Sequence, residues 1–220
     1  MRRTRHVKLL VLLLPLPLIL SMAGVFVLFT QWWGGDLGYV LSFLVYWLIW
    51  CLMVPAVLLG RVHLQSLLRP GRPLFARANL GAAALWLVVT IVALIMYLPD
   101  ALAAPGLLFA IAVPVGTLNG FFEEVLWRGL YLRTFSDAPL MAWVYPAIPF
   151  ALWHFVPQLT FPAEGGTLSL VLSTLFLGLA YGYVTWKTES VRWAAISHGL
   201  SGVIALGGAI APSIHRMVGG

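Results

Sequence analysis

Glu123, Glu124 and Arg128 place two carboxylates and a guanidinium group in an otherwise apolar run, residues 121–130. An ionised side chain at membrane depth costs at least about 2.5 kcal/mol and usually faces a cavity or a partner, so it marks a candidate site. On a helix, Glu124 and Arg128 share a face, with the acid on the N-terminal side, the better orientation for an ion pair. Glu123 is rotated by about 100° from Glu124. We therefore predict that Glu124 pairs with Arg128 and that Glu123 is left for chemistry.

Two histidines, His154 and His198, also lie inside apolar runs. A glutamate can act as a general base toward water, and a histidine can polarise a carbonyl group or stabilise an oxyanion. Glu123, His154 and His198 could instead bind a metal, which makes one zinc ion a candidate cofactor. A third interpretation is a structural ion-pair network that only locks two helices together. The chain has neither H-E-x-x-H nor G-x-S-x-G, which excludes a zincin helix and a serine nucleophile elbow.

The composition of the 220-residue chain predicts a polytopic membrane protein. Hydrophobic residues make up 61% of the sequence and charged residues only 9%, whereas soluble domains average about 25% charged residues. We predict an all-α transmembrane helical bundle that forms a single integral-membrane domain, residues 1–220, with the lipid bilayer as a partner. The net charge of +6 does not indicate nucleic-acid binding, because most basic residues lie in short loops where they set membrane topology.

Seven apolar runs are candidate membrane spans: about 9–30, 37–60, 80–98, 102–132, 138–156, 168–186 and 193–211. A straight fifth helix from Ala138 would place His154 about 24 Å along it, away from Glu123 and His198. We therefore predict a short or bent fifth helix that begins near Pro146 or Pro149. In the sixth span, the four-residue spacing of two glycines, at 178 and 182, predicts the close approach of a neighbouring helix.

The distribution of basic residues predicts a cell-membrane protein with its N-terminus in the cytoplasm. In this orientation the cytoplasmic ends carry Arg2, Arg3, Arg5, Lys8, Arg61, Arg69, Arg72, Arg77, Arg128, Arg133, Lys187 and Arg192. The external segments carry Asp36, Asp100 and Glu164, and Arg216 is the one basic residue on that side.

Three motifs on separate apolar runs resemble one known family. In chain order they are Glu123-Glu124-x-x-x-Arg128, Phe150-x-x-x-His154 and His198. Together they resemble the CAAX prenyl endopeptidase and bacteriocin-processing (CPBP, or Abi) family over about residues 100–205, the predicted catalytic half. The resemblance implies an intramembrane endopeptidase, of the glutamate type or metal-dependent, that cuts a membrane-associated peptide or a lipidated protein.

The resemblance also implies roles for individual residues. Glu123 would activate water, and the pair of Glu124 and Arg128 would support the site. His154 and His198 would assist the glutamate and the oxyanion. The assignment of the chemistry to Glu123 therefore agrees with the one made from helical geometry.

The sequence departs from the family pattern at Gly202, where the family usually has asparagine or aspartate four residues after the last histidine. Two residues are candidate replacements as an oxyanion or substrate donor. Ser201 is three residues from His198, and Asn119 is four residues before Glu123, on the same helical face. We also expect an asparagine at position 202 to be accommodated without loss of the fold.

Two other functions fit the same residues. A non-catalytic member of the fold could bind or protect a membrane partner, which the missing side chain at Gly202 favours. A small proton-coupled transporter could use the glutamates and histidines as a relay, although transporters often contain internal repeats and none is visible in this sequence.

Overall fold

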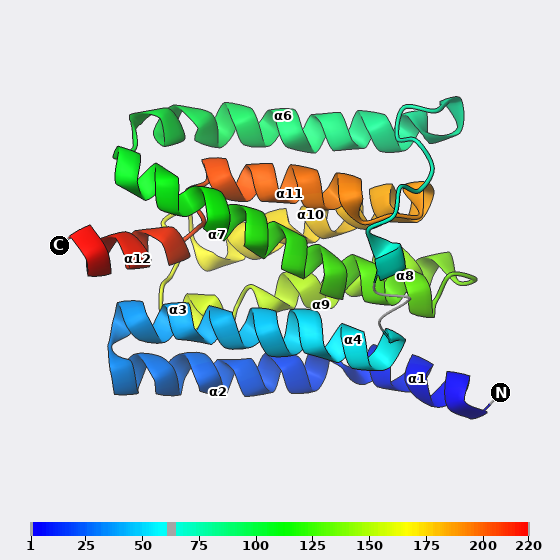
Figure 1. Ribbon diagram of the computed structural model, residues 1–220, viewed down its shortest axis with the longest axis horizontal. Coiled ribbons are helices and arrows are strands. Elements are labelled where there is room, and N and C mark those ends of the chain that lie inside the picture. Colours follow the sequence, from blue (N-terminus) through cyan, green and yellow to red (C-terminus); the bar gives the residue numbers. More distant parts are fainter. Residues whose placement is uncertain (1, 61–64, 220) are drawn as a thin grey trace.

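The computed structural model describes residues 2–60 and 65–219, and this part of the chain contains helices and turns but no strand (Figure 1). The α-helices are α1 (Arg2–Leu13), α2 (Pro15–Trp33), α3 (Gly35–Val45), α4 (Val54–Leu59), α6 (Leu80–Ala103), α7 (Gly106–Glu124), α8 (Tyr131–Thr134), α9 (Tyr145–Trp153), α10 (Thr167–Thr188), α11 (Arg192–Ile204) and α12 (Ile210–Gly219). The structure also has three π-helical segments, η1 (Tyr46–Met53), η3 (Val125–Leu130) and η4 (Leu140–Val144), and two 3-10 turns, η2 (Arg77–Asn79) and η5 (Pro157–Leu159). The predicted all-α helical bundle is confirmed.

Within the described residues, six helical stretches are long and apolar enough to cross a membrane: Arg5–Trp33, Gly35–Leu59, Arg77–Ala103, Gly106–Thr134, Leu140–Leu159 and Thr167–Thr188. The chain is therefore a multi-pass membrane protein. The seventh predicted span is not one continuous helix, because α11 has 13 residues and extends only about 20 Å. It ends at a turn in which Leu206, Gly207 and Gly208 have φ angles of 54°, 64° and 58°. These left-handed conformations cannot continue a right-handed helix.

The fifth candidate span contains the predicted short helix. The π-helical segment η4 is followed by α9, which has only nine residues and contains Pro146 and Pro149. The helical stretch is continuous from Leu140 to Leu159, and Pro146 and Pro149 have no N–H to donate within it. The helix ends at Trp153, so His154 lies directly at its C-terminus.

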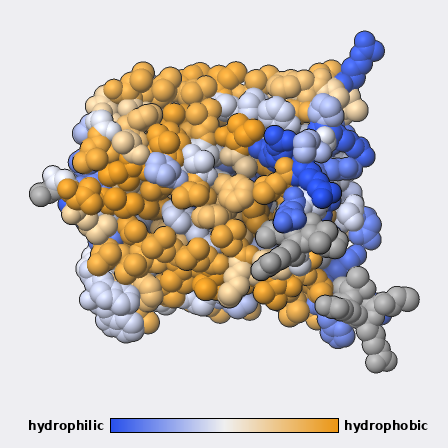
Figure 2. Space-filling model, in the orientation of Figure 1, coloured by the Kyte–Doolittle hydropathy of each residue, from blue (hydrophilic) through white to orange (hydrophobic). Residues whose placement is uncertain are grey.

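The two ends of the bundle differ in charge. The N-terminus, residues 65–79, α8 and the start of α11 lie at the right in Figure 1, and Figure 2 shows hydrophilic residues gathered there. We call this the basic end; its basic residues are Arg5, Lys8, Arg69, Arg72, Arg77, Arg133, Lys187 and Arg192. Arg61 lies outside the described residues. Arg128, which the sequence groups with these residues, is instead buried inside the bundle.

The opposite end, which we call the acidic end, contains the α2–α3 turn, the α6–α7 turn, residues 160–166 and α12 (Figure 1). Asp36, Asp100 and Glu164 lie there. Arg216, the one basic residue predicted at this end, pairs with Asp36, and its Nε lies 3.0 Å from Asp36 Oδ2. Hydrogen bonding to this carboxylate raises the pKa of Arg216 above its usual value.

Glycines bring α7 and α11 into close backbone contact. A Cβ added at Gly120 would lie 2.5 Å from the Gly199 nitrogen, and one at Gly116 would collide with the backbone at Gly202. A Cβ at Gly202 would itself lie 3.0 Å from the Gly116 Cα and carbonyl oxygen. Asparagine at position 202 would therefore require the α7 backbone at Gly116 to give by a few tenths of an ångström, and the expectation that it is accommodated stays a prediction.

A second glycine contact joins α10 to the segment that precedes His154. A Cβ added at Gly178 would lie 3.0 Å from the Ala147 side chain, and one at Gly182 would lie 2.8 Å from the Trp143 carbonyl oxygen. The predicted close approach at this glycine pair is confirmed, and it involves α9 and η4.

The α7–α11 contact generates a test of the packing. Gly120→Ala is expected to lower the free energy of unfolding by about 1–3 kcal/mol, because overpacking forces the two backbones apart. Gly24→Ala in α2 is the matched control, since a Cβ added there meets no atom within 4 Å. Unfolding of both variants in detergent measures the difference, and equal stability of the two would contradict the close contact.

Candidate active site

The two adjacent glutamates end α7 and lie inside the bundle. The exposed fraction of Glu123 is 2% and that of Glu124 is 0%. Arg128 follows on the π-helical segment η3, and its Nη1 lies 2.9 Å from Glu124 Oε1. The predicted pairing of Glu124 with Arg128 is confirmed, and Glu123 points to a different set of partners.

The Arg128 guanidinium is stabilised by aromatic rings as well as by the carboxylate. Its Cζ lies 4.1 Å from the centroid of the Phe150 ring and 5.7 Å from that of Tyr181. The contact with Glu124 is a close ion pair without the alignment of a hydrogen bond, since neither Nη atom has a hydrogen-bond partner among the described residues. Proximity to the carboxylate and to the ring faces therefore compensates the buried charge.

Phe150, the aromatic residue of the second motif, contacts three polar groups of the site. Besides lying under Arg128, its ring is edge-on to His154 at 4.7 Å and to His198 at 6.3 Å between centroids. A single buried ring thus lies against both histidines and the guanidinium.

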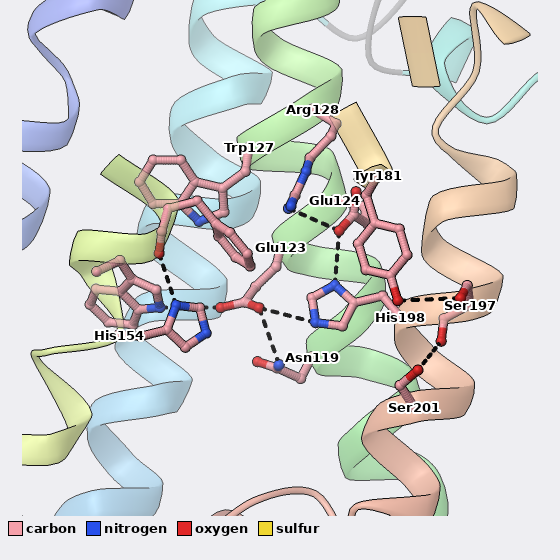
Figure 3. A network of polar contacts seen from close by, with 12 residues as sticks. Asn119, Glu123, Glu124, Trp127, Arg128, His154, Tyr181, Ser197, His198 and Ser201 are labelled. Carbon is pink, nitrogen blue, oxygen red and sulfur yellow. Dashed lines mark hydrogen bonds and ion pairs between the residues drawn. The ribbon is translucent and has the colours of Figure 1, made fainter. Parts of the chain in front are cut away.

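His198 is oriented by Glu124. Its Nδ1 donates a hydrogen bond of 2.8 Å to Glu124 Oε1, because an ionised carboxylate can only accept. This bond fixes the imidazole tautomer and directs Nε2 toward Glu123, whose Oε2 lies 3.5 Å away (Figure 3). Glu124 therefore holds both Arg128 and His198, and His198 connects the two carboxylates.

Glu123 accepts hydrogen bonds from three neutral donors. Its Oε1 accepts from the Tyr46 hydroxyl at 3.1 Å and from the Trp153 indole at 3.2 Å. Its Oε2 accepts from Asn119 Nδ2 at 3.3 Å. The Trp127 indole in turn donates to the Tyr46 hydroxyl at 2.8 Å. Neutral donors stabilise the ionised carboxylate without adding a counter-charge, and they fix the orientation of Glu123.

Sequence reasoning missed Tyr46, Trp127 and Trp153. Indole and phenol side chains in apolar runs ordinarily indicate packing, and their N–H and O–H groups find partners only when buried. One signal was available, since Trp153 directly precedes His154. A second signal is visible only in the structure. Tyr46 and Trp127 belong to π-helical segments, and such segments occur frequently at functional sites.

His154 lies beside the carboxylate of Glu123 in Figure 3, and both residues line the same cavity. The His154 Nδ1 donates to the Phe150 carbonyl oxygen at 2.8 Å. In the neutral imidazole, Nε2 is then an acceptor rather than a donor. The short α9 therefore does bring His154 to the other predicted residues.

The two candidate replacements for the missing donor at position 202 are placed differently. Asn119 lines the cavity, and its Oδ1 accepts a hydrogen bond of 2.9 Å from the Trp47 indole, which orients the amide toward Glu123. The Ser201 hydroxyl donates to the Ser197 carbonyl oxygen at 2.8 Å. Ser201 is not among the residues that line the cavity, so the structure brings Asn119 to Glu123 and leaves Ser201 apart.

A cavity of about 1090 Å³ is lined by Glu123 and by residues at the acidic end of the bundle. Its lining includes Gly35, Asp36, Tyr39, Phe43, Asn119, His154, Phe161, Glu164, Gly202, Ala205 and Arg216. Its volume is near the upper limit of ordinary ligand pockets, about 300–1,000 Å³, so it can admit a segment of polypeptide.

The predicted metal ligands Glu123, His154 and His198 do not fit a metal centre in this arrangement. In residues 2–60 and 65–219, no group of three or more histidine, cysteine or acidic side chains is arranged to hold a metal ion. Both oxygens of Glu123 accept hydrogen bonds from O–H or N–H groups. These hydrogens point at the positions that a cation would occupy, and the same donors favour a carboxylate that acts as a base.

The charge pair in this site predicts a large loss of stability on substitution. Arg128→Met is expected to lower the free energy of unfolding by about 3–5 kcal/mol, because it removes the guanidinium that compensates the buried Glu124. The double variant Glu124→Gln/Arg128→Met should lose less than the sum of the single variants, because it leaves no uncompensated charge.

The control is Arg72→Met, which breaks the exposed 2.8 Å pair with Glu189 and should change stability by at most about 1 kcal/mol. Denaturant titration of the purified protein in detergent measures all of these variants. Equal losses for Arg72→Met and Arg128→Met would show that the buried pair has no special role.

Comparison with known proteins agrees with the geometry. Residues 105–204 match the family described as "Type II CAAX prenyl endopeptidase Rce1-like". No curated protein and no solved structure matches the chain. The matched region begins at α7 and ends with α11, so it contains both glutamates, Arg128 and both histidines. The chain therefore carries an Rce1-like domain of the CAAX prenyl endopeptidase (CPBP, or Abi) family, as its motifs predict.

Proposed function

We propose that this protein is an intramembrane endopeptidase that hydrolyses a peptide bond of a membrane-associated protein or peptide with a water molecule activated by Glu123. One observation carries the proposal. Glu123 is a buried carboxylate, oriented by three neutral donors, that lines a cavity large enough for a peptide segment. Membership of a prenyl endopeptidase family supports the same reaction class.

Glu123 acts as the general base in this mechanism. Its carboxylate takes a proton from water while the water oxygen attacks the carbonyl carbon of the scissile bond. As the C–N bond of the tetrahedral intermediate breaks, the protonated Glu123 gives the proton to the leaving amine nitrogen. Water thus adds across the peptide bond, and Glu123 returns to its ionised form.

Glu124 and Arg128 act as positioning residues. Glu124 accepts from Nδ1 of His198 and keeps Nε2 directed at Glu123. His198 can then share the proton that Glu123 receives from water, because its Nε2 lies 3.5 Å from Glu123 Oε2. Loss of Glu124 or Arg128 would affect catalysis through the orientation of His198.

Asn119 stabilises the oxyanion in place of the side chain missing at Gly202. The Asn119 amide nitrogen carries two hydrogens, and one of them bonds to Glu123. The second is available to the carbonyl oxygen of the substrate, on which negative charge develops. His154 presents Nε2 as an acceptor, so it orients the attacking water together with Glu123.

A non-catalytic function, in which the protein binds or protects a membrane partner, is the second candidate. The observation that favours it is Gly202, which has no side chain and packs against the α7 backbone. The two candidate functions differ in whether peptide bonds are cut.

Glu123→Gln is expected to abolish cleavage and to leave the fold intact, because glutamine keeps the size of the side chain but cannot accept a proton from water. The N-termini of membrane proteins, measured by mass spectrometry, are compared between cells that carry the wild-type chain and cells that carry the variant. Glu189→Gln, which weakens only the exposed pair with Arg72, is the matched control and should behave as wild type. If the same N-termini persist with Glu123→Gln, the non-catalytic function is favoured.

For the substrate that this comparison identifies, a metal chelator should leave cleavage by the purified wild-type protein unchanged. Inhibition by the chelator, reversed by added zinc, would instead support a metal-dependent reaction at Glu123, His154 and His198. The chelator thus separates the two mechanisms that the sequence leaves open.

Asn119→Ala is expected to lower the turnover of the same substrate by about 10²–10³-fold, the usual cost of removing one oxyanion donor. Ser201→Ala is the matched control and should retain wild-type turnover, because its hydroxyl is bonded to the Ser197 carbonyl. The reverse result, a loss only with Ser201→Ala, would assign the oxyanion to the α11 helix.

A further inference from the structure

Indole N–H groups donate to several polar side chains of the candidate site. The donors are Trp47, Trp127 and Trp153. An amide group can turn over, and a carboxyl group changes from acceptor to donor when it takes up a proton, whereas an indole N–H can only donate. Hydrogen bonds from these indoles therefore keep their direction when a neighbouring group takes up or loses a proton.

The Asn119 amide is held by two neighbours. Its Oδ1 accepts from Trp47 Nε1 at 2.9 Å, and its Nδ2 donates to Glu123 Oε2 at 3.3 Å (Figure 3). If the amide turned over, its NH2 group would face the indole N–H and its oxygen would face the carboxylate. Donor would then oppose donor, and acceptor would oppose acceptor. While Glu123 is ionised, both neighbours therefore favour the observed orientation.

The proposed reaction removes one of these two constraints. Glu123 Oε1 already accepts from Tyr46 and Trp153, and Oε2 accepts from Asn119. The proton from water therefore goes to Oε2, which has the free lone pair and faces Asn119. The resulting carboxyl group can donate, so it would also bond to a turned amide through the amide oxygen. In this same step the substrate carbonyl oxygen becomes negative and needs the amide N–H.

We propose that Trp47 is a positioning residue that keeps the Asn119 amide nitrogen directed at the substrate while Glu123 carries the proton. A turned amide would place its NH2 group against the Trp47 N–H in either protonation state of Glu123. Trp47 is 6% exposed and is not among the residues that line the cavity, so it acts through Asn119. This inference rests on the proposed peptidase function and on the oxyanion role of Asn119.

Packing holds the Trp47 ring in the direction that this role requires. The centroid of the ring lies 5.8 Å from that of Phe43 and 5.9 Å from that of Phe122. Phe43 precedes Trp47 by four residues on the same helical stretch, and Phe122 lies on α7 with Asn119. Aromatic contacts on both helices therefore keep the indole N–H at a fixed place relative to the amide.

The positioning residue lies outside the region that matches the family. Trp47 and the adjacent Tyr46 both belong to η1, and the Tyr46 hydroxyl donates to Glu123. Two consecutive residues of one π-helical segment thus reach the amide and the carboxylate of the site. The family match covers residues 105–204, so the proposed reaction also depends on a helix that the match does not include.

The test is a double-mutant cycle, measured on the substrate that the comparison of N-termini identifies. Trp47→Phe is expected to lower kcat by about 3–10-fold, the factor that corresponds to one hydrogen bond between neutral groups, and to leave KM unchanged. In the Asn119→Ala background, the same substitution should change kcat by less than about twofold, because the amide on which Trp47 acts is absent. Equal losses in both backgrounds would overturn the inference and assign Trp47 to the packing of the fold.

Two further variants separate the N–H group from the ring. Trp50→Phe is the matched control and should keep wild-type kcat, because Trp50 lies in the same π-helical segment but makes no side-chain hydrogen bond with any described residue. Benzothienylalanine at position 47 keeps the two-ring shape and has sulfur in place of the N–H group. It should lower kcat as Trp47→Phe does, and it replaces that variant if Trp47→Phe does not fold. Wild-type kcat with this side chain would overturn the inference.

An NMR measurement tests the orientation of the amide without a substrate. Asparagine occurs only at positions 79 and 119, so protein made with 15N-asparagine gives two sets of side-chain amide signals, which Asn119→Ala assigns. Asn79 donates to the Pro73 carbonyl oxygen at 2.9 Å and is the internal reference. Benzothienylalanine at position 47 should shift the Asn119 signals and leave the Asn79 signals in place. Unchanged Asn119 signals would overturn the inference.

Failure of this inference differs from failure of the proposed function. If Glu123→Gln removes no N-termini, the peptidase function fails, and the inference fails with it. If Glu123→Gln abolishes cleavage but Trp47→Phe leaves kcat unchanged, the peptidase function stands and the inference alone fails.

Discussion

The cost of placing ionised groups in an apolar bundle is the constraint on which the rest of this structure depends. Glu123, Glu124 and Arg128 are all at most 2% exposed, and an uncompensated ion in such surroundings costs several kcal/mol. Each charge therefore needs partners at close range. Glu124 has Arg128 and His198, and Glu123 has a set of neutral donors. This division leaves one carboxylate neutralised by charge and the other oriented by neutral donors.

Close helix contacts supply the required distances. The glycines of α7 and α11 let the two backbones approach, and this places His198 2.8 Å from Glu124. The glycines of α10 let α9 and η4 approach in the same way, and α9 carries Phe150 and Trp153. The close contact between Gly202 and the Gly116 backbone therefore accounts for a glycine at position 202. Where the family usually has a polar side chain, this chain has a backbone contact, and a polar side chain one turn before Glu123 lies in the cavity instead.

The parts of the site that were predictable from sequence depend on local geometry. The pair of Glu124 and Arg128 follows from a four-residue spacing, and the short α9 follows from its prolines and from the need to bring His154 to Glu123. The Tyr46 and Trp153 donors were not predictable, because their partner lies 77 and 30 residues away. The end of α11 at Ile204 was also missed, because the left-handed turn that follows includes Leu206, a residue type that rarely has a positive φ. Contacts between helices, rather than propensities within them, decide these features.

The sequence separation of 74 residues between Glu124 and His198 has a consequence for biosynthesis. At about 5–20 residues per second, the ribosome delivers the carboxylate to the membrane about 4–15 s before its histidine partner. During this interval the segment must enter the bilayer with its charges already in place. Arg128 lies only four residues after Glu124 and therefore emerges almost together with it. The two side chains can pair before any other helix is present. The ion pair that supports the finished site thus also compensates the charges of this segment when it enters the membrane, before His198 has been synthesised.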